Sequence, residues 1–220
     1  RLEQGAHSYI YLADRLLEFP ASLLSVSLGV ALLPTLSALK ARGEESKMAE
    51  LLNENIRMLL VLSLPSACGL YFLAEPLISL VFERGEFTAS DVSATAQVLR
   101  IYSAVLIFSG IHRVLVPSFY SRKNTWAPAL TSAISVAVHY FVASYAVEAY
   151  GLQGLIVSTA ITGVLNLVLL TLGHRFLYGP IGFTKVTLSS LKLLPSLALM
   201  SLFCFYGYQY FSGQIYLWVH

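Results

Sequence analysis

The chain has 220 residues, of which 56% are hydrophobic and only 12% are charged, and its formal net charge is +2. Soluble domains carry about 25% charged residues, so this balance excludes an ordinary soluble fold and predicts a protein embedded in a lipid bilayer. The small net charge and the lack of a dense Lys/Arg block exclude nucleic acid as a partner.

Long apolar stretches recur along the whole chain. A helix needs roughly 20 apolar residues to cross a bilayer, and six stretches reach that length. They cover residues 7–35, 56–82, 94–120, 126–147, 152–177 and 186–211. The sequence therefore predicts an all-α integral membrane protein with about six transmembrane helices. Five of them lie within residues 1–177, and residues 178–220 form a linker and one further helix.

Positive charges gather in alternate links between these stretches. The richer links carry Lys40, Arg42, Lys47 and Arg57 after the first stretch, Arg122 and Lys123 after the third, and Arg175, Lys185 and Lys192 after the fifth. Links rich in Lys and Arg usually face the cytoplasm. The first helix should therefore enter from the outer side. The chain begins with Arg1 and has no signal peptide, so we expect an internal piece of a longer protein.

The first stretch carries three charges near its start, within YIYLADRLLEFP at residues 9–20. On a helix they belong to a polar stripe that recurs every three or four residues. An ionised side chain at bilayer depth costs about 2.5 to 3.5 kcal/mol on insertion scales, so the stripe should face a water-filled cavity or the protein interior. Its members are His7, Tyr11, Asp14, Arg15, Glu18, Ser22, Ser25 and Gly29.

Two interpretations of these charges stay open from the residues alone. One places Asp14, Arg15 and Glu18 at the membrane interface, where charges cost little and arginine can extend toward water. The other places Arg15 in an aqueous cavity, where it meets an anionic substrate and the two carboxylates set its position. Pro20 removes a helix hydrogen bond one turn further on and can bend the helix, which adds weight to the second interpretation.

Four other features of the chain also bear on its structure and function. Arg113, about eight residues before the SRKN turn, either extends to the interface or contacts substrate. His139 is expected to make an interhelical hydrogen bond rather than to act as a proton relay. Residues 46–60, SKMAELLNENIRMLL, have apolar residues at helical spacing and form either a cytoplasmic surface helix or an extension of a helical hairpin. Cys68 and Cys204 lie in apolar stretches and predict neither a disulfide nor a metal site.

Four segments of the sequence together resemble the MurJ (MviN) family of lipid II flippases and cover most of residues 8–170. The Ala-Asp-Arg-Leu and Phe-Tyr-Ser-Arg elements carry the most specific part of the resemblance. The segments are SYIYLADRLLEFPASLLSVSLGVALLPTLS at 8–37, LPSACGLYFLAEPLISLVFERGEFTASD at 64–91, RVLVPSFYSRKNTWAP at 113–128 and GLQGLIVSTAITGVLN at 151–166.

The resemblance implies a fold of fourteen membrane helices, with two six-helix lobes and a final pair, within the MOP exporter superfamily. The present chain would match helices eight to thirteen and lack the N-terminal lobe, helix seven and helix fourteen. Members flip an undecaprenyl-pyrophosphate-linked disaccharide pentapeptide across the bacterial inner membrane for peptidoglycan synthesis. By this resemblance Arg15 would contact the pyrophosphate, which a guanidinium can engage bidentately. Asp14 and Glu18 would be its charged neighbours, and Arg113 is a further candidate.

The implied partners are lipid II, membrane lipid, the missing N-terminal lobe and cell-wall synthesis proteins. We expect a transporter that works by alternating access, with no catalytic residue, metal or cofactor. Ala143 stands where family members that bind sodium often have Asn, which speaks against sodium coupling. Two alternatives stay open: another MOP-type exporter of polysaccharide-linked lipids, and a non-transporting membrane scaffold for cell-wall synthesis.

Overall fold

The computed structural model describes the backbone of residues 5–181 and 192–219, and the side chains of these residues outside 23–31, 205 and 208–219. It confirms the predicted all-α class, because the described part of the chain contains helices and no strand. In chain order the helices are α1 (Ala6–Ala41), α2 (Glu45–Phe72), α3 (Ala74–Phe82), α4 (Ala89–Tyr120), α5 (Trp126–Tyr178) and α7 (Leu194–Val219).

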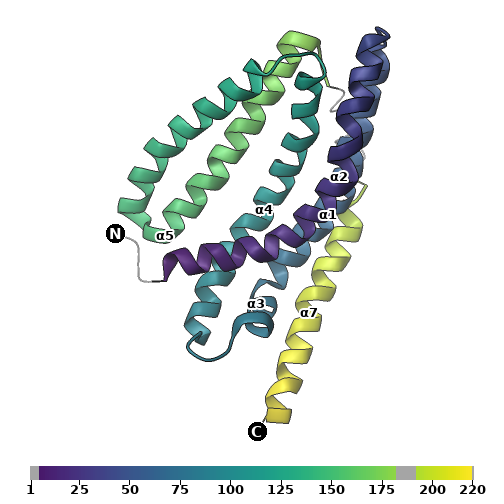
Figure 1. Cartoon of the computed structure of the whole chain (residues 1–220). Helices are drawn as coiled ribbons and strands as arrows, with labels where there is room; N and C mark the ends of the chain where they lie inside the picture. Colours follow the sequence, from purple (N-terminus) through teal and green to yellow (C-terminus); the bar gives the residue numbers. More distant parts are fainter. Residues whose placement is uncertain (1–4, 182–191, 220) are drawn as a thin grey trace.

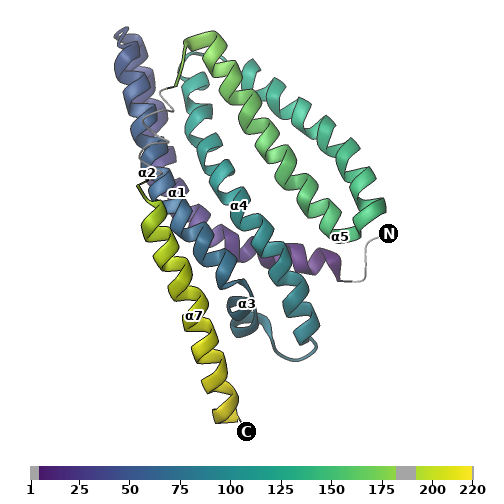
Figure 2. The same ribbon diagram turned by 180° about the vertical axis from the view of Figure 1, so that it is seen from behind.

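Helix α4 occupies the centre of the bundle. It contacts α1, α2, α3 and α5, and Figures 1 and 2 show it between the two arms of α5 on one side and α1 and α2 on the other. Helix α7 runs beside α2. Because α4 touches helices on both sides, its side chains can meet residues from opposite parts of the bundle.

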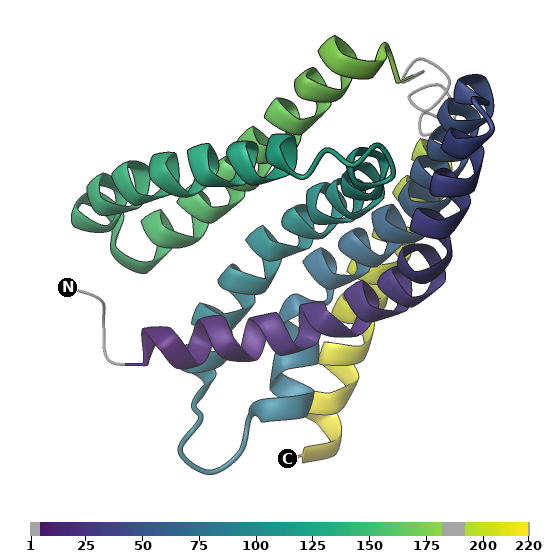
Figure 3. The ribbon, with the colours of Figure 1, turned by 45° about the horizontal axis from the view of Figure 1, so that its top comes forward.

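Helix α5 spans 53 residues and is a hairpin of two helical arms. The chain reverses at Gly151, whose φ of 56° and ψ of −132° are not helical, and the two arms then run side by side (Figure 3). A Cβ added to Gly154 would lie 2.0 Å from the carbonyl oxygen of Ala146, so only glycine allows this close approach. The fourth and fifth predicted stretches fall on either side of this reversal.

Three described helices, α2, α4 and α5, are long and apolar enough to cross a bilayer. The second predicted stretch, 56–82, is divided at Leu73 into α2 and α3. Pro76 explains the division, because it has no N–H to donate to the carbonyl of Phe72 four residues earlier. The predicted sixth stretch, 186–211, begins outside the described residues, which also exclude Lys185, and its residues 194–211 belong to α7.

Residues 46–60 belong to α2 and extend its hairpin with α1. Met48, Leu52 and Ile56 are fully buried and share an apolar cluster with Leu36 of α1 and Phe119 of α4. The structure therefore agrees with the second interpretation, in which these residues extend a helical hairpin, and not with a separate surface helix.

Helix α1 bends along its length, as Figure 3 shows, and it contains Pro20 and Pro34. Each proline removes a backbone hydrogen bond and allows a helix to bend. The side of α1 near its start packs Ala13 into a second apolar cluster with Ile78 and Leu99. The two ends of α1 are therefore held in different parts of the core.

Candidate functional site

Arg15 lies on the exposed side of α1, beside the buried Ala13. Its Nη1 donates to Oε2 of Glu18 at 2.8 Å, and its Nη2 donates to the hydroxyl of Tyr11 at 3.0 Å. Its Cζ atom stands 4.8 Å from the centroid of the Tyr11 ring. These contacts join residues one turn apart on the same helix, as helical spacing predicts. The guanidinium is thus oriented by α1 alone.

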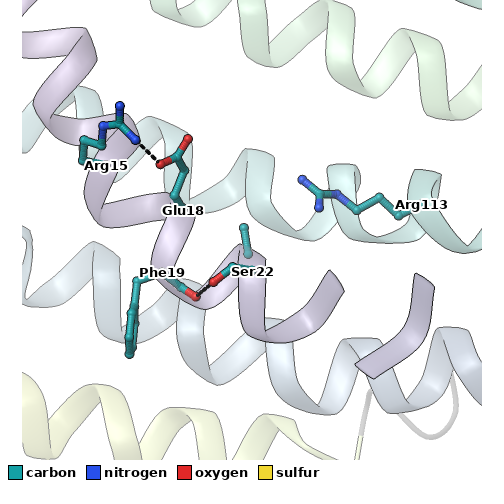
Figure 4. A pocket seen from close by; sticks show the side chains of 6 residues that line it. Arg15, Glu18, Phe19, Ser22 and Arg113 are labelled. Atoms are coloured by element: carbon teal, nitrogen blue, oxygen red, sulfur yellow. Dashed lines mark hydrogen bonds and ion pairs between the residues drawn. The ribbon is translucent and has the colours of Figure 1, made fainter. Parts of the chain in front are cut away.

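A cleft of about 500 Å³ brings Arg15 together with Arg113 of α4. Figure 4 shows the Arg113 side chain extending from α4 toward the Arg15–Glu18 pair. The backbone near each arginine packs in a different part of the core. Ala13, near Arg15, and Val114, next to Arg113, belong to separate apolar clusters. The cleft is lined by Arg15, Glu18, Phe19, Ala21, Ser22 and Arg113.

The charges that line this cleft favour an anion. Arg15 and Arg113 contribute two positive charges and Glu18 one negative charge, so the lining has a net charge of +1. The side chains of Arg15 and Glu18 are 55% and 60% exposed, and an exposed ion pair of this kind is weak. A ligand carrying phosphate can therefore reach the Arg15 guanidinium without first opening a buried contact.

The polar stripe predicted along α1 is only partly gathered at the cleft. Arg15, Glu18 and Ser22 line it, whereas Asp14 is exposed and lies outside the lining. The Ser22 hydroxyl donates to the carbonyl of Phe19 at 2.8 Å. The side chain of Ser25 lies outside those that the structure describes. The structure thus joins three of the four candidate residues, Arg15, Glu18 and Arg113, and leaves Asp14 beside them.

His139 makes the interhelical hydrogen bond that the sequence predicts. Its Nδ1 lies 3.3 Å from the hydroxyl of Thr162, and these residues belong to the two arms of α5. Hydrogen bonds of this kind connect membrane helices. His139 therefore has a structural partner and does not line the cleft.

Arg122 forms a polar network that the sequence does not reveal. Its guanidinium donates to Oε2 of Glu45 in α2 at 2.7 Å and to the hydroxyl of Ser118 in α4 at 2.8 Å. It also stands 4.4 Å from the centroid of the Tyr178 ring in α5, while Ser118 Oγ lies 3.0 Å from Nε2 of His174. From the sequence, Arg122 and Lys123 indicated only which side of the membrane their turn faces. No local pattern shows that helices α2, α4 and α5 meet at Arg122.

Comparisons with known proteins give consistent matches. The family model described as lipid II flippase MurJ matches residues 1–219. A probable lipid II flippase MurJ from Bdellovibrio bacteriovorus is 48% identical over 169 residues, which cover 77% of this chain and 32% of the relative. The lipid II flippase MurJ from Burkholderia cenocepacia is 38% identical over 176 residues, which cover 80% of this chain and 34% of the relative.

A solved structure of a lipid II flippase MurJ in an inward closed conformation has a similar fold. The TM-score is 0.73 at 24% sequence identity, and the match covers 97% of this chain and 49% of the other. The chain spans about a third of the length of the curated relatives it matches. The family model covers nearly the whole chain, and the predicted resemblance is thereby confirmed. The chain therefore belongs to the MurJ family of lipid II flippases.

Proposed function

We propose that this chain acts as part of a lipid II flippase, which moves undecaprenyl-pyrophosphate-linked peptidoglycan precursor across the bacterial inner membrane by alternating access. The observation that carries the proposal is the meeting of Arg15 from α1 and Arg113 from α4 at one cleft. A pyrophosphate presents several acceptor oxygens, and a planar guanidinium can bind two of them at once. Two guanidinium groups at one cleft suit such a ligand.

Within this proposal each candidate residue has a separate role. Arg15 and Arg113 bind the pyrophosphate, and Glu18 holds the Arg15 guanidinium in place until the substrate arrives. Asp14, outside the cleft lining, adjusts the local charge around Arg15. No covalent step is needed, because binding energy and a change between two conformations suffice for transport.

The proposal also specifies the partners of this chain and the position of its helices in the full-length flippase. The remaining helices of a full-length flippase would supply the opposite wall of the cleft, and membrane lipid would surround the apolar helix faces. Residues 1–177 would provide five membrane helices of one lobe, and residues 178–220 a linker and one further helix. Cell-wall synthesis proteins would receive the translocated precursor on the outer side.

A complementation experiment tests this function. The full-length protein that carries these residues is produced in bacteria depleted of their own lipid II flippase, and Arg15→Glu is compared with the unchanged protein. We expect Arg15→Glu to fail to restore growth and lipid II to accumulate on the inner leaflet, because the introduced carboxylate repels the pyrophosphate.

Arg84→Glu is the matched control for that experiment. Arg84 is an exposed arginine in the turn between α3 and α4 and does not line the cleft, so the same charge reversal there should leave growth normal. Full growth with Arg15→Glu at normal expression would refute the site. Lipid II distributed normally in cells that still fail to grow would favour a scaffold over a flippase.

A further inference from the structure

A groove of about 1040 Å³ lies between α4, the second arm of α5 and the end of α2. It is on the other side of α4 from the Arg15 cleft. Ala104 lines the groove and Arg113 lines the cleft, and these positions are separated by about two and a half helical turns. A ligand in the groove would therefore not compete for the Arg15 cleft.

The lining of the groove changes from polar to apolar along α4. Ser90 and Gln97 of α4, with Gln153 of α5, line one end, and Ala104 and Ala160 line the other. From Ser90 to Ala104 the helix rises about 21 Å, which exceeds the roughly 15 Å of one half of the hydrocarbon core. The groove is therefore long enough to reach from the lipid headgroups into the region of the acyl chains.

The polar end of the groove faces the outer side in the predicted topology. The turn between α3 and α4 has Arg84 as its only Lys or Arg residue, and the turn at Gly151 has none, whereas links rich in these residues usually face the cytoplasm. Tyr71 and Tyr150 line the groove near these turns and are 49% and 72% exposed. Tyrosine is common at the level of the headgroups, so the polar end belongs at the outer headgroup layer.

The polar end offers hydrogen-bond donors and one positive charge. Among the described residues, Arg100 is the only charged residue that lines the groove, and its side chain is 36% exposed. Its Nη2 donates to Oε2 of Glu75 at 3.1 Å, which uses one of the five guanidinium N–H groups. Gln153 Nε2 donates to Oε1 of Gln97 at 2.8 Å, which leaves the Gln97 amide nitrogen for an acceptor. A phosphodiester, which is anionic and has only acceptor oxygens, is complementary to these groups.

We propose that this groove binds a phospholipid of the outer leaflet, with its phosphate at Arg100 and Gln97 and an acyl chain along the apolar end. A free phosphate would leave the apolar end unfilled, and a hydrocarbon chain alone would cover the polar donors without pairing them. The volume lies at the upper limit of small-molecule sites, about 300 to 1,000 Å³. The proposal is independent of the flippase function, because the phospholipid is held outside the Arg15 cleft.

The test measures binding to the delipidated full-length protein in detergent by native mass spectrometry. Three probes separate the phosphate from the chains. Dioctanoyl phosphatidylglycerol has both, dioctanoylglycerol has the same chains without phosphate, and glycerol phosphate has the phosphate without chains. Phosphatidylglycerol should bind, and each incomplete probe should bind about tenfold more weakly or less.

Arg100→Gln tests the phosphate contact, and Glu75→Gln is its matched control. Both changes break the same ion pair, but only the first removes the guanidinium. Arg100→Gln should weaken phosphatidylglycerol binding about tenfold and leave dioctanoylglycerol binding unchanged, whereas Glu75→Gln should weaken neither. Equal loss in both variants would assign the ion pair to the fold and overturn the phosphate contact.

Ala104→Trp tests the apolar end, and Ala137→Trp is its matched control. Both are exposed alanines of long apolar helices, but Ala137 does not line the groove. Ala104→Trp should weaken the binding of both chain-bearing probes about tenfold, whereas Ala137→Trp should change neither. Arg15→Gln should leave phosphatidylglycerol binding unchanged, which separates this site from the cleft. Phosphatidylglycerol binding that is insensitive to Arg100→Gln and Ala104→Trp would overturn the proposal, as would glycerol phosphate that binds as tightly as the lipid.

Discussion

Two arginines of this protein make similar contacts and yet have opposite surroundings. Arg15 and Arg122 each stand over a tyrosine ring, at 4.8 Å from the Tyr11 centroid and 4.4 Å from the Tyr178 centroid, and each donates to a glutamate. The Arg15 side chain is 55% exposed, whereas that of Arg122 is 7% exposed.

The origin of the partners explains this difference. Tyr11 and Glu18 lie on the same helix as Arg15, so their contacts orient the guanidinium without joining helices. The partners of Arg122 come from α2, α4 and α5, so its charge connects three elements. An arginine that holds the fold together is not free for a ligand, whereas one held only by its own helix remains available. Changes to Arg122 should therefore lower the stability of the protein, whereas changes to Arg15 should weaken ligand binding.

The largest effect should follow from Arg122→Ala. This change removes the contacts to Glu45, Ser118 and the Tyr178 ring, and we expect the free energy of unfolding to fall by about 2 to 3 kcal/mol. This loss of stability is measured by thermal unfolding of the full-length protein in detergent. Arg15→Ala is the control and should leave the unfolding temperature nearly unchanged. Equal destabilisation by both changes would contradict the distinction.

Arg113→Gln should affect binding more than stability. Arg113 is exposed on α4 and lines the cleft with Arg15, so its loss should weaken binding of undecaprenyl pyrophosphate about tenfold. Affinity measured for Arg113→Gln, Arg15→Gln and the double variant shows whether the two residues act on one ligand. An unchanged affinity in either single variant would contradict the prediction that both residues bind this ligand.

The two tyrosines provide a matched pair of smaller changes. The Tyr178 hydroxyl accepts a hydrogen bond from Nδ2 of Asn124 at 2.9 Å, which joins α5 to the turn before it. Tyr178→Phe should therefore lower the free energy of unfolding by about 1 kcal/mol. Tyr11→Phe removes only an exposed contact to Arg15 and should not change the unfolding curve. A greater loss from Tyr11→Phe would mean that α1 needs this contact to fold.

The smallest effect should come from Glu18→Gln. The change removes the negative charge from the cleft lining and leaves an amide near Arg15, so binding of undecaprenyl pyrophosphate should strengthen about threefold. The gain should shrink as salt is raised, since salt screens exposed charges. Binding curves at low and high salt measure both effects. Weaker binding at low salt would show that the orientation of Arg15 by Glu18 contributes more to binding than the repulsion between Glu18 and the phosphate costs.

Helix content and membrane character follow from the sequence by itself. Apolar length and helical spacing are local properties, so they predict the long helices and the polar stripe that carries Arg15 and Glu18. The resemblance of the Ala-Asp-Arg-Leu element to a known family also needs no structure. The division of one predicted stretch at Leu73 had a local signal in Pro76, which the apolar pattern hid.

Only the tertiary structure decided which charges meet. Arg113 reaches the cleft of Arg15 because α4 packs against α1, and Arg122 becomes buried because α2 and α5 converge on the end of α4. Spacing along one helix sets which side a residue faces, whereas the packing of several helices sets what it faces.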